Sequence, residues 1–290
     1  MPAAETPGPT GELLAQISDD GGVEFARPDR PLIRADDRAV VRGDAVFETL
    51  RAAGGRLDNE SAHLDRLEGS AAAMGLPVPD RAAWTELARQ VTAAWGARSE
   101  GMLRLVYSRG VEDSGRPTCL AMMSSVPEST LRHRRDGVRV VTLARGLAAA
   151  DHADAPWLLV GAKTTSYAVN MAAQRHARAI GADDAIFLAT DGQVLEAPTA
   201  TVVWAVGKTL CTPPVEAGIL DGTAVRALFR RAPEHGLSTD IRRAWVADLH
   251  AADGVWLTSS VRGAVVVTAI DGQVRGDAGL TPRVQSAAGL

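Results

Sequence analysis

The sequence predicts an α/β protein of two domains, in which mixed or antiparallel sheets are flanked by helices. The chain has 290 residues, of which 46% are apolar, so it can bury more core than one small domain needs. Strand-like segments follow one another through short turns, a pattern that disfavours a doubly wound parallel sheet. The polar stretch 127–137, PESTLRHRRDG, lacks an apolar face and indicates a linker between the two halves.

The first domain is expected over 11–130, after a tail at 1–10 whose proline, glycine and small residues predict disorder. Alternating or continuous apolar runs predict strands at 11–18, 22–27, 45–52, 101–110 and 118–125. Helical apolar spacing predicts a helix over 60–74, with Asn59 as its N-cap, and a second helix over about 81–95.

The second domain is expected over 131–290. Its predicted strands lie at 138–144, 185–190, 200–206, 209–212, 255–260 and 264–270. Its predicted helices lie at 166–180 and 223–231. This is the larger domain, and it is expected to contain Lys163.

Charge and cysteine content exclude several classes of protein. The 31 basic and 35 acidic side chains form no basic stripe, so we expect no nucleic-acid partner. The isolated Cys119 and Cys211 make neither a disulfide framework nor a zinc site, and no His, Cys or acidic cluster has metal spacing. No secretion signal is apparent, and no apolar run reaches the roughly 20 residues of a membrane helix. We therefore expect a cytoplasmic protein with small-molecule partners.

Lysine occurs only at Lys163 and Lys208, and all other basic residues are arginines. Arginine does not deprotonate in proteins, so only these two side chains offer a reactive amine. In APWLLVGAKTTSYAVN an apolar run leads directly into Lys163, and burial there would favour the neutral amine that attacks an aldehyde. The alternative is a lysine that extends from a strand edge into solvent. Lys208 lies in a predicted hairpin turn.

Four further features are candidates for binding an anionic, nitrogen-containing ligand. Glu196 precedes an apolar strand and offers a carboxylate for a cationic ring nitrogen, or is an ordinary rim residue. Gly222 leads into a helix at Thr223, whose N–H groups suit a phosphate, although the same pattern serves as a simple cap. Ser259 and Ser260 end a strand and offer hydroxyl donors, or form a plain turn. Arg66, in HLDRL, is either a phosphate ligand or a surface arginine.

Together and in this order, these segments resemble the class IV aminotransferase family of pyridoxal 5′-phosphate (PLP) enzymes, fold type IV, over roughly residues 30–272. The segments that carry the resemblance are GDAVFETLR at 43–51, HLDRL at 63–67, GAKTTSYAVNMAA at 161–173, LEAPTATVVW at 195–204, ILDGTAVR at 219–226 and LTSS at 257–260. Ala45 stands where the family usually has glycine, and Ala224 stands where a hydroxyl residue is common. The resemblance also implies a homodimer.

The resemblance implies a role for each matching residue. Lys163 would be the Schiff-base lysine and catalytic acid/base, Glu196 would contact the pyridine nitrogen, and Arg66 would bind the phosphate. The other phosphate donors would be the backbone of Gly222, Thr223 and Ala224 together with Ser259 and Ser260.

Within the family, the chain resembles aminodeoxychorismate lyases, which convert 4-amino-4-deoxychorismate to 4-aminobenzoate and pyruvate in folate synthesis. D-amino-acid transaminases resemble the chain less, because SRGVEDSGRPTCL lacks their Arg-x-His pair and Phe47 stands where they prefer tyrosine. We expect Phe47 and Arg109 to contact substrate, and Thr49 to assist the leaving group. The alternatives are a D-amino-acid or branched-chain transaminase and, more remotely, a non-catalytic binding protein.

Overall fold

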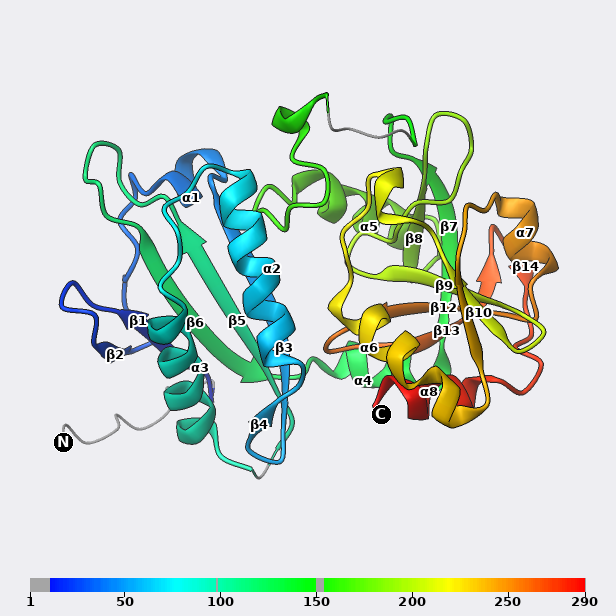
Figure 1. Cartoon of the computed structure of the whole chain (residues 1–290), viewed down its shortest axis with the longest axis horizontal. Coiled ribbons are helices and arrows are strands. Elements are labelled where there is room, and N and C mark those ends of the chain that lie inside the picture. Colours follow the sequence, from blue (N-terminus) through cyan, green and yellow to red (C-terminus); the bar gives the residue numbers. More distant parts are fainter. Residues whose placement is uncertain (1–10, 98, 150–153, 290) are drawn as a thin grey trace. The chain divides into compact units, whose positions relative to one another are not determined.

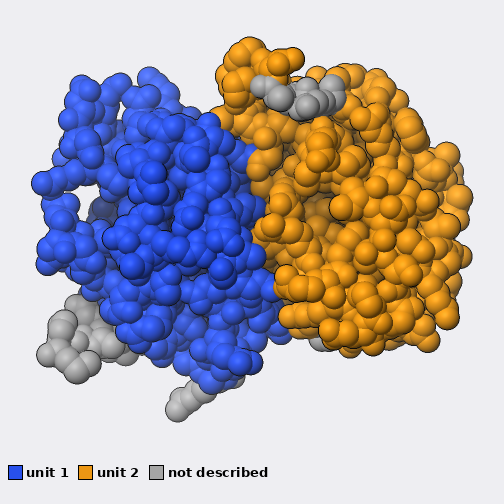
Figure 2. Space-filling view, viewed as in Figure 1, with its two compact units in different colours: residues 1–127, 162–166 blue, residues 128–161, 167–290 orange. Residues whose placement is uncertain are grey.

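The structure is a computed structural model that describes residues 11–97, 99–149 and 154–289. It comprises two compact units, which Figure 2 distinguishes by colour. Unit 1 holds the described residues up to Pro127 together with Ala162–Ser166, and unit 2 holds the described residues of 128–161 and 167–290. The tail at 1–10, for which disorder is predicted, lies outside the described residues.

Unit 1 is built on an antiparallel sheet with the strand order β2-β1-β6-β5-β3-β4. Its strands are β1 (Leu13–Ile17), β2 (Val23–Ala26), β3 (Ala45–Ala53), β4 (Arg56–Leu57), β5 (Gly101–Ser108) and β6 (Thr118–Ser125). Its helices are α1 (Arg38–Arg42), α2 (Glu60–Ala73) and α3 (Arg81–Trp95). The helix α3 begins where the Asp80 side chain accepts hydrogen bonds from the backbone of Ala82 and Ala83.

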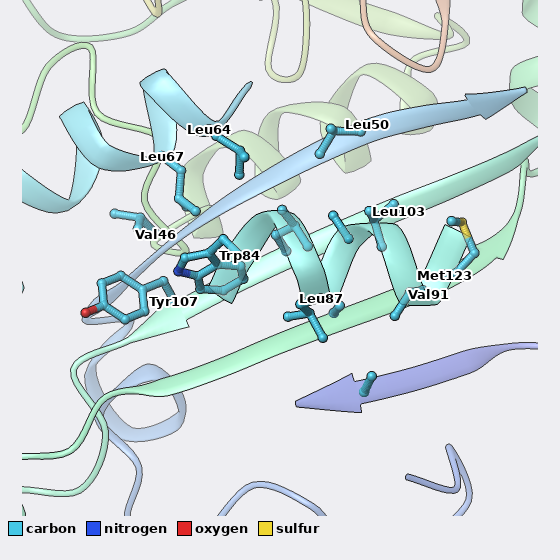
Figure 3. Packing of buried hydrophobic residues seen from close by; sticks show 14 of the residues in the cluster. Val46, Leu50, Leu64, Leu67, Trp84, Leu87, Val91, Leu103, Tyr107 and Met123 are labelled. Atoms are coloured by element: carbon cyan, nitrogen blue, oxygen red, sulfur yellow. The ribbon is translucent and has the colours of Figure 1, made fainter. Parts of the chain in front are cut away.

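The two faces of this sheet have different environments. Alternation along β3 turns Val46, Glu48 and Leu50 toward α2 and α3, and all three are buried. Figure 3 shows the apolar core on this side, where Trp84 and Leu87 of α3 pack with β3 and β5. Residues of the opposite face, among them Phe47 and Thr49, are only half-buried.

The segment Ala162–Ser166 belongs to unit 1 because it extends the sheet along the free edge of β3. Val46 and Thr164 form an antiparallel bridge. The backbone N–H of Phe47 donates to the Lys163 carbonyl at 3.0 Å, and that of Thr165 donates to the Ala45 carbonyl at 2.8 Å. Lys163 lies in the C-terminal half of the sequence, but these long-range backbone bonds place it in the N-terminal unit.

Unit 2 contains a mixed sheet in the order β11-β10-β9-β12-β13-β7-β8, with β14 paired to β13. Its strands are β7 (Val138–Ala144), β8 (Asp184–Leu188), β9 (Thr201–Val206), β10 (Thr209–Thr212), β11 (Ser238–Ile241), β12 (Gly254–Ser259), β13 (Gly263–Ile270) and β14 (Gln273–Val274). Its helices are α4 (Glu128–Asp136), α5 (Ala168–Ala179), α6 (Thr223–Arg231), α7 (Val246–Ala251) and α8 (Thr281–Ala288). Short 3₁₀ turns are η1 (Pro156–Leu158), η2 (Val215–Ala217) and η3 (Ala232–His235). Helices α6 and α8 pack together, and contact β12 and β13 respectively (Figure 1).

The predicted fold class, with mixed or antiparallel sheets flanked by helices, is confirmed. One local prediction is corrected. The stretch expected to be a linker forms the helix α4, in which no residue is buried, and charges that suit the helix dipole stabilise it: Glu128 in the first turn and His133, Arg134 and Arg135 in the last. Asn59 is the N-cap of α2, as predicted, with a left-handed φ of 52° and no capping hydrogen bond from its side chain.

Within the described ranges, no helix combines the length and apolar character that crossing a membrane requires. Cys119 and Cys211 are both free thiols. Burial raises the pKa of the Cys119 thiol to about 12, so this side chain is protonated at neutral pH.

Candidate active site

The amine of Lys163 lies over an aromatic ring of unit 1. Its Nζ is 4.3 Å from the centre of the Phe47 ring, within the range of a cation–π contact. The two residues are opposite each other across the edge of β3, where the backbone of Phe47 donates to the Lys163 carbonyl. This pairing directs both side chains to the half-buried face of the sheet.

Thr49 and Arg104 lie on the same face of the sheet as Phe47. Thr49 is two residues beyond Phe47 on β3, and Arg104 of β5 is its antiparallel partner. The Nε of Arg104 is buried and has no hydrogen-bond partner among the described residues. Arg134 and Arg275 also have a buried Nε of this kind, so it is the position of Arg104 beside Thr49 that makes it a candidate for binding an anionic group. Sequence reasoning missed Arg104, although strand alternation from Phe47 and Thr49 through this register could have found it.

The opposite face of β3 carries a buried carboxylate, Glu48, which is 0% exposed. Arg66 of α2 donates to it in a bidentate manner, from Nε at 2.7 Å and from Nη2 at 2.8 Å. The Nδ1 of His63, one helical turn earlier on α2, is 2.7 Å from Oε2 of the same carboxylate. Glu48 was not predicted as a site residue, but its position between Val46 and Leu50 on the core face signals a paired charge.

The electrostatics of this cluster follow from burial and pairing. Burial alone would raise the pKa of Glu48, but the hydrogen bonds from Arg66 and His63 outweigh it and hold the pKa at about 2. Burial lowers the pKa of His63, against the opposing effect of Glu48. At neutral pH Glu48 is therefore ionised, and a neutral His63 donates its Nδ1 proton to it.

Helix α2 also contacts the backbone of Lys163. The Oγ of Ser70 accepts a hydrogen bond from the Lys163 N–H at 3.1 Å, and Ser70 is buried. Ser70 follows His63 by seven residues and Arg66 by four, so the three side chains share one face of the helix. One face of α2 thus holds both the carboxylate of β3 and the backbone of the candidate lysine.

Arg109, predicted to face a substrate carboxylate, is surrounded by structural partners. Its Nε donates to Asp44 at 2.7 Å, and its two terminal nitrogens donate to the backbone carbonyls of Met74 and Gly75 at 2.8 and 3.1 Å. The hydrogen bond from Arg109 lowers the pKa of Asp44. These bonds tie the end of β5 to the start of β3 and to the end of α2, a role that accounts for the residue's position.

In unit 2, Glu196 lies beside the carboxyl end of β8. Its Oε1 accepts from Nη1 of Arg145 at 2.9 Å, and its Oε2 accepts from the backbone N–H of Leu220 at 3.1 Å. Arg145 follows the end of β7, the parallel neighbour of β8, and stacks over the Phe187 ring at 5.3 Å. Both carboxylate oxygens are therefore held in fixed directions. Sequence reasoning missed Arg145, which has no distinguishing local signal among so many arginines.

The predicted phosphate residues of unit 2 are brought together. The Oγ1 of Thr223, at the first position of α6, is 3.3 Å from the Oγ of Ser260, which directly follows β12. Gly222 is the N-cap of α6, and the first turn of a helix directs N–H groups outward. A Cβ at Gly222 would lie 2.5 Å from Oγ1 of Thr201, so a larger residue would require Thr201 to move. The neighbouring Ala224 contributes only its backbone to this turn.

The described residues contain no group of three or more His, Cys, Asp or Glu side chains arranged to hold a metal ion. Unit 1 by itself carries the amine of Lys163, and unit 2 by itself carries a carboxylate that suits a cationic nitrogen and hydroxyl and backbone donors that suit a phosphate. Groups of these kinds bind an organic cofactor that bears a phosphate and an aldehyde.

Comparisons with known proteins agree with this chemistry. Residues 45–270 match the family model described as amino-transferase class IV. The chain is 48% identical, over 86% of its length and 90% of the relative, to a bifunctional aminodeoxychorismate lyase / D-amino acid transaminase of Mycobacterium tuberculosis. It is 28% identical to a D-alanine aminotransferase of Bacillus licheniformis, over 87% of the chain and 89% of that relative.

A solved structure shares the fold along nearly the whole chain. It is a hypothetical aminotransferase from Mycobacterium tuberculosis in a PLP-bound form, with a TM-score of 0.92 and 44% identity. The match covers 96% of this chain and 97% of the other. The resemblance inferred from the sequence motifs is thereby confirmed.

Proposed function

Because this chain belongs to the class IV aminotransferase family, we propose that it is a PLP-dependent enzyme that converts 4-amino-4-deoxychorismate to 4-aminobenzoate and pyruvate. The observation that carries the proposal is the position of Lys163, one of two lysines in the chain. Its backbone is hydrogen-bonded to β3 and to Ser70, and its amine lies over the Phe47 ring. The nature of the relatives supports the lyase, since the 48% identical one is named for lyase and transaminase activities.

The residues present fit PLP by the chemistry of their donors. Lys163 supplies the amine for the aldehyde, and Glu196 supplies a carboxylate for the ring nitrogen. The turn of Gly222, Thr223 and Ala224, with Ser259 and Ser260, supplies backbone and hydroxyl donors for the phosphate. Arg66 is proposed as a further phosphate ligand.

When bound, PLP supplies an electron sink that stabilises negative charge at the amine-bearing carbon of the substrate. Lys163 removes the proton from that carbon, which is general-base catalysis by a positioned amine. Thr49 is on the same sheet face as Phe47 and assists departure of the enolpyruvyl oxygen. Loss of this proton and of the enolpyruvyl group leaves the aromatic ring of 4-aminobenzoate, and the released enol becomes pyruvate.

Arg104 and Arg109 are the candidates for binding the substrate carboxylates. Arg109 was proposed from the sequence, but three of its nitrogens are bonded to Asp44, Met74 and Gly75. Arg104 lies beside Thr49 with a buried Nε that has no hydrogen-bond partner in the described part of the chain. We therefore propose Arg104 as a carboxylate ligand in addition to Arg109, with Phe47 as the apolar contact.

A transaminase is the second candidate, because the 48% identical relative carries both activities in its name and another relative is a D-alanine aminotransferase. The two reactions share proton removal by Lys163. They differ in the fate of the substrate, because the lyase expels the enolpyruvyl group, whereas a transaminase transfers the amino group to a keto acid.

A paired assay on PLP-loaded protein tests the proposal. One reaction receives 4-amino-4-deoxychorismate and is analysed for pyruvate and 4-aminobenzoate. The other receives D-alanine and 2-oxoglutarate and is analysed for pyruvate and glutamate. Product in the first supports the lyase, product only in the second replaces it with the transaminase, and product in both gives a bifunctional enzyme. Absence of PLP binding would leave the non-catalytic alternative.

The proposal also includes a cytoplasmic homodimer. The dimer follows from the family resemblance, and the free thiols of Cys119 and Cys211 suit a reducing compartment. A mass measurement in solution tests the dimer.

A further inference from the structure

Glu48 is a buried charge that the proposed reaction does not use. Glu48 is completely buried on the core face of β3, where an ionised carboxylate is costly unless it is paired and hydrogen-bonded. An alanine, valine or leucine at this position would suit the surrounding core of Val46 and Leu50. The retained charge is compensated by two residues of one helix, Arg66 and His63.

The contact between Glu48 and Arg66 has a defined geometry. Two parallel N–H···O bonds, of 2.7 and 2.8 Å, join Nε and Nη2 of Arg66 to the two carboxylate oxygens. Such a pair fixes the plane of the guanidinium and removes most of its rotamer freedom. A guanidinium carries five N–H donors, so one guanidinium plane can in general serve more than one acceptor.

His63 completes the cluster and connects it to the lysine. Its Nδ1 is 2.7 Å from Oε2, the oxygen that also accepts from Nη2 of Arg66. The charge of Lys163 contributes to the lowering of the His63 pKa, so the cluster lies within electrostatic reach of the amine. On the same helix face, Ser70 binds the backbone of Lys163.

We propose that Glu48 is a positioning residue, whose carboxylate holds the guanidinium of Arg66 in the orientation that contacts the cofactor phosphate. The inference rests on the proposed function, because it requires PLP as the ligand. The competing explanation is that the cluster only fastens α2 to β3. The two explanations predict different results. Loss of a positioning residue weakens the binding of ligands that carry a phosphate, whereas loss of a residue that only joins α2 to β3 lowers the stability of the fold.

The test compares PLP with pyridoxal, which has the same ring and aldehyde but no phosphate. Dissociation constants of both compounds are measured for the full-length protein and for Glu48→Gln, and thermal unfolding is recorded on each cofactor-free protein. We expect Glu48→Gln to weaken PLP binding about tenfold or more while pyridoxal binding changes by less than about twofold, because a charge-assisted hydrogen bond is misaligned.

A second variant and a matched control make the result decisive. Glu48→Asp keeps the charge but shortens the side chain by one methylene. It should weaken PLP binding less than Glu48→Gln does and leave pyridoxal binding unchanged. If Glu48→Gln does not fold, Glu48→Asp takes its place in the test. Asp184→Asn removes the equally buried partner of Arg262, a 2.7 Å ion pair in unit 2, and should lower stability without changing the ratio of PLP to pyridoxal affinity.

Each outcome has one meaning. Equal weakening of PLP and pyridoxal, or no weakening of either, would overturn the positioning role and leave Glu48 as a structural residue. Failure of the unmodified protein to bind PLP would instead overturn the proposed function, before any variant is compared. A loss of affinity that is confined to PLP supports the positioning role of Glu48 and the proposed function.

Discussion

The Nζ of Lys163 lies 4.3 Å from the centre of the Phe47 ring, although the two residues are more than a hundred positions apart in the sequence. The backbone bond between them puts the lysine on the edge of β3. Thr49 and Arg104 are on the same sheet face, so a reactive amine, a hydroxyl and a guanidinium are gathered on neighbouring backbone segments. The proposed reaction depends on these three groups lying close together.

Replacement of Lys163 should greatly reduce catalytic activity without changing the fold. In Lys163→Ala the backbone bonds to Ser70 and Phe47 remain, so the unfolding temperature should change little. Lyase activity should fall by about 10³-fold, the scale of a lost acid–base group. Borohydride trapping of bound PLP, followed by peptide mass analysis, should label Lys163 alone. Lys208→Ala, in the turn between β9 and β10, is the matched control and should keep both label and activity.

Substitution should distinguish the two candidate arginines. Arg104→Gln removes a charge whose Nε lacks a protein acceptor in the described residues, so stability should be kept while KM for the substrate rises about tenfold. Arg109→Gln breaks bonds to Asp44 and to two backbone carbonyls, so it should lower the free energy of unfolding by about 1–2 kcal/mol. Steady-state kinetics measure KM, and urea unfolding measures the free energy of unfolding, for both variants. A higher KM for Arg109→Gln alone would leave Arg109 as the carboxylate ligand and remove Arg104 from that role.

Local periodicity was sufficient to predict most of the elements. The alternation of AVFETLRA predicted β3, and the helical spacing of Leu64, Leu67 and Ala71 predicted α2, because each element buries one regular face. The helix α4 was missed for the same reason: it buries no residue, so its sequence carries no apolar period.

Pairing between distant residues was not predictable in this way. SRG at 108–110 does not show that Arg109 bonds to Asp44, nor that the buried Nε of Arg104 has no partner among the described residues. The edge pairing of Lys163 with Phe47 depends on the fold of the whole unit. Residue roles at Lys163, Glu196 and Gly222 came from motif resemblance, and they remain predictions.

The N-cap of α6 should not tolerate a side chain. In Gly222→Ala the new Cβ would lie 2.5 Å from Oγ1 of Thr201, so we expect a loss of about 1–3 kcal/mol of stability and weaker PLP binding. Thr201→Ala in the same chain should restore part of the stability, since it removes the obstructing oxygen. Gly276→Ala, where a Cβ meets nothing within 4 Å, is the control and should behave as the unmodified protein. Equal Tm values for the two glycine variants would contradict the steric argument.

Acid should destabilise the protein through the Glu48 cluster. The pKa of Glu48 falls from 4.5 to about 2 on folding, which corresponds to about 3 kcal/mol of stability that is present above pH 4.5 and is lost as the pH falls toward 2. The pKa of His63 is also lowered on folding, below 6.5, so its contribution is complete above pH 6.5 and declines as the pH falls. Urea unfolding at a series of pH values, for the unmodified protein and Glu48→Gln, measures both effects. The unmodified protein should lose stability more steeply than the variant between pH 4.5 and 2, and parallel curves would show that Glu48 is not the titrating group.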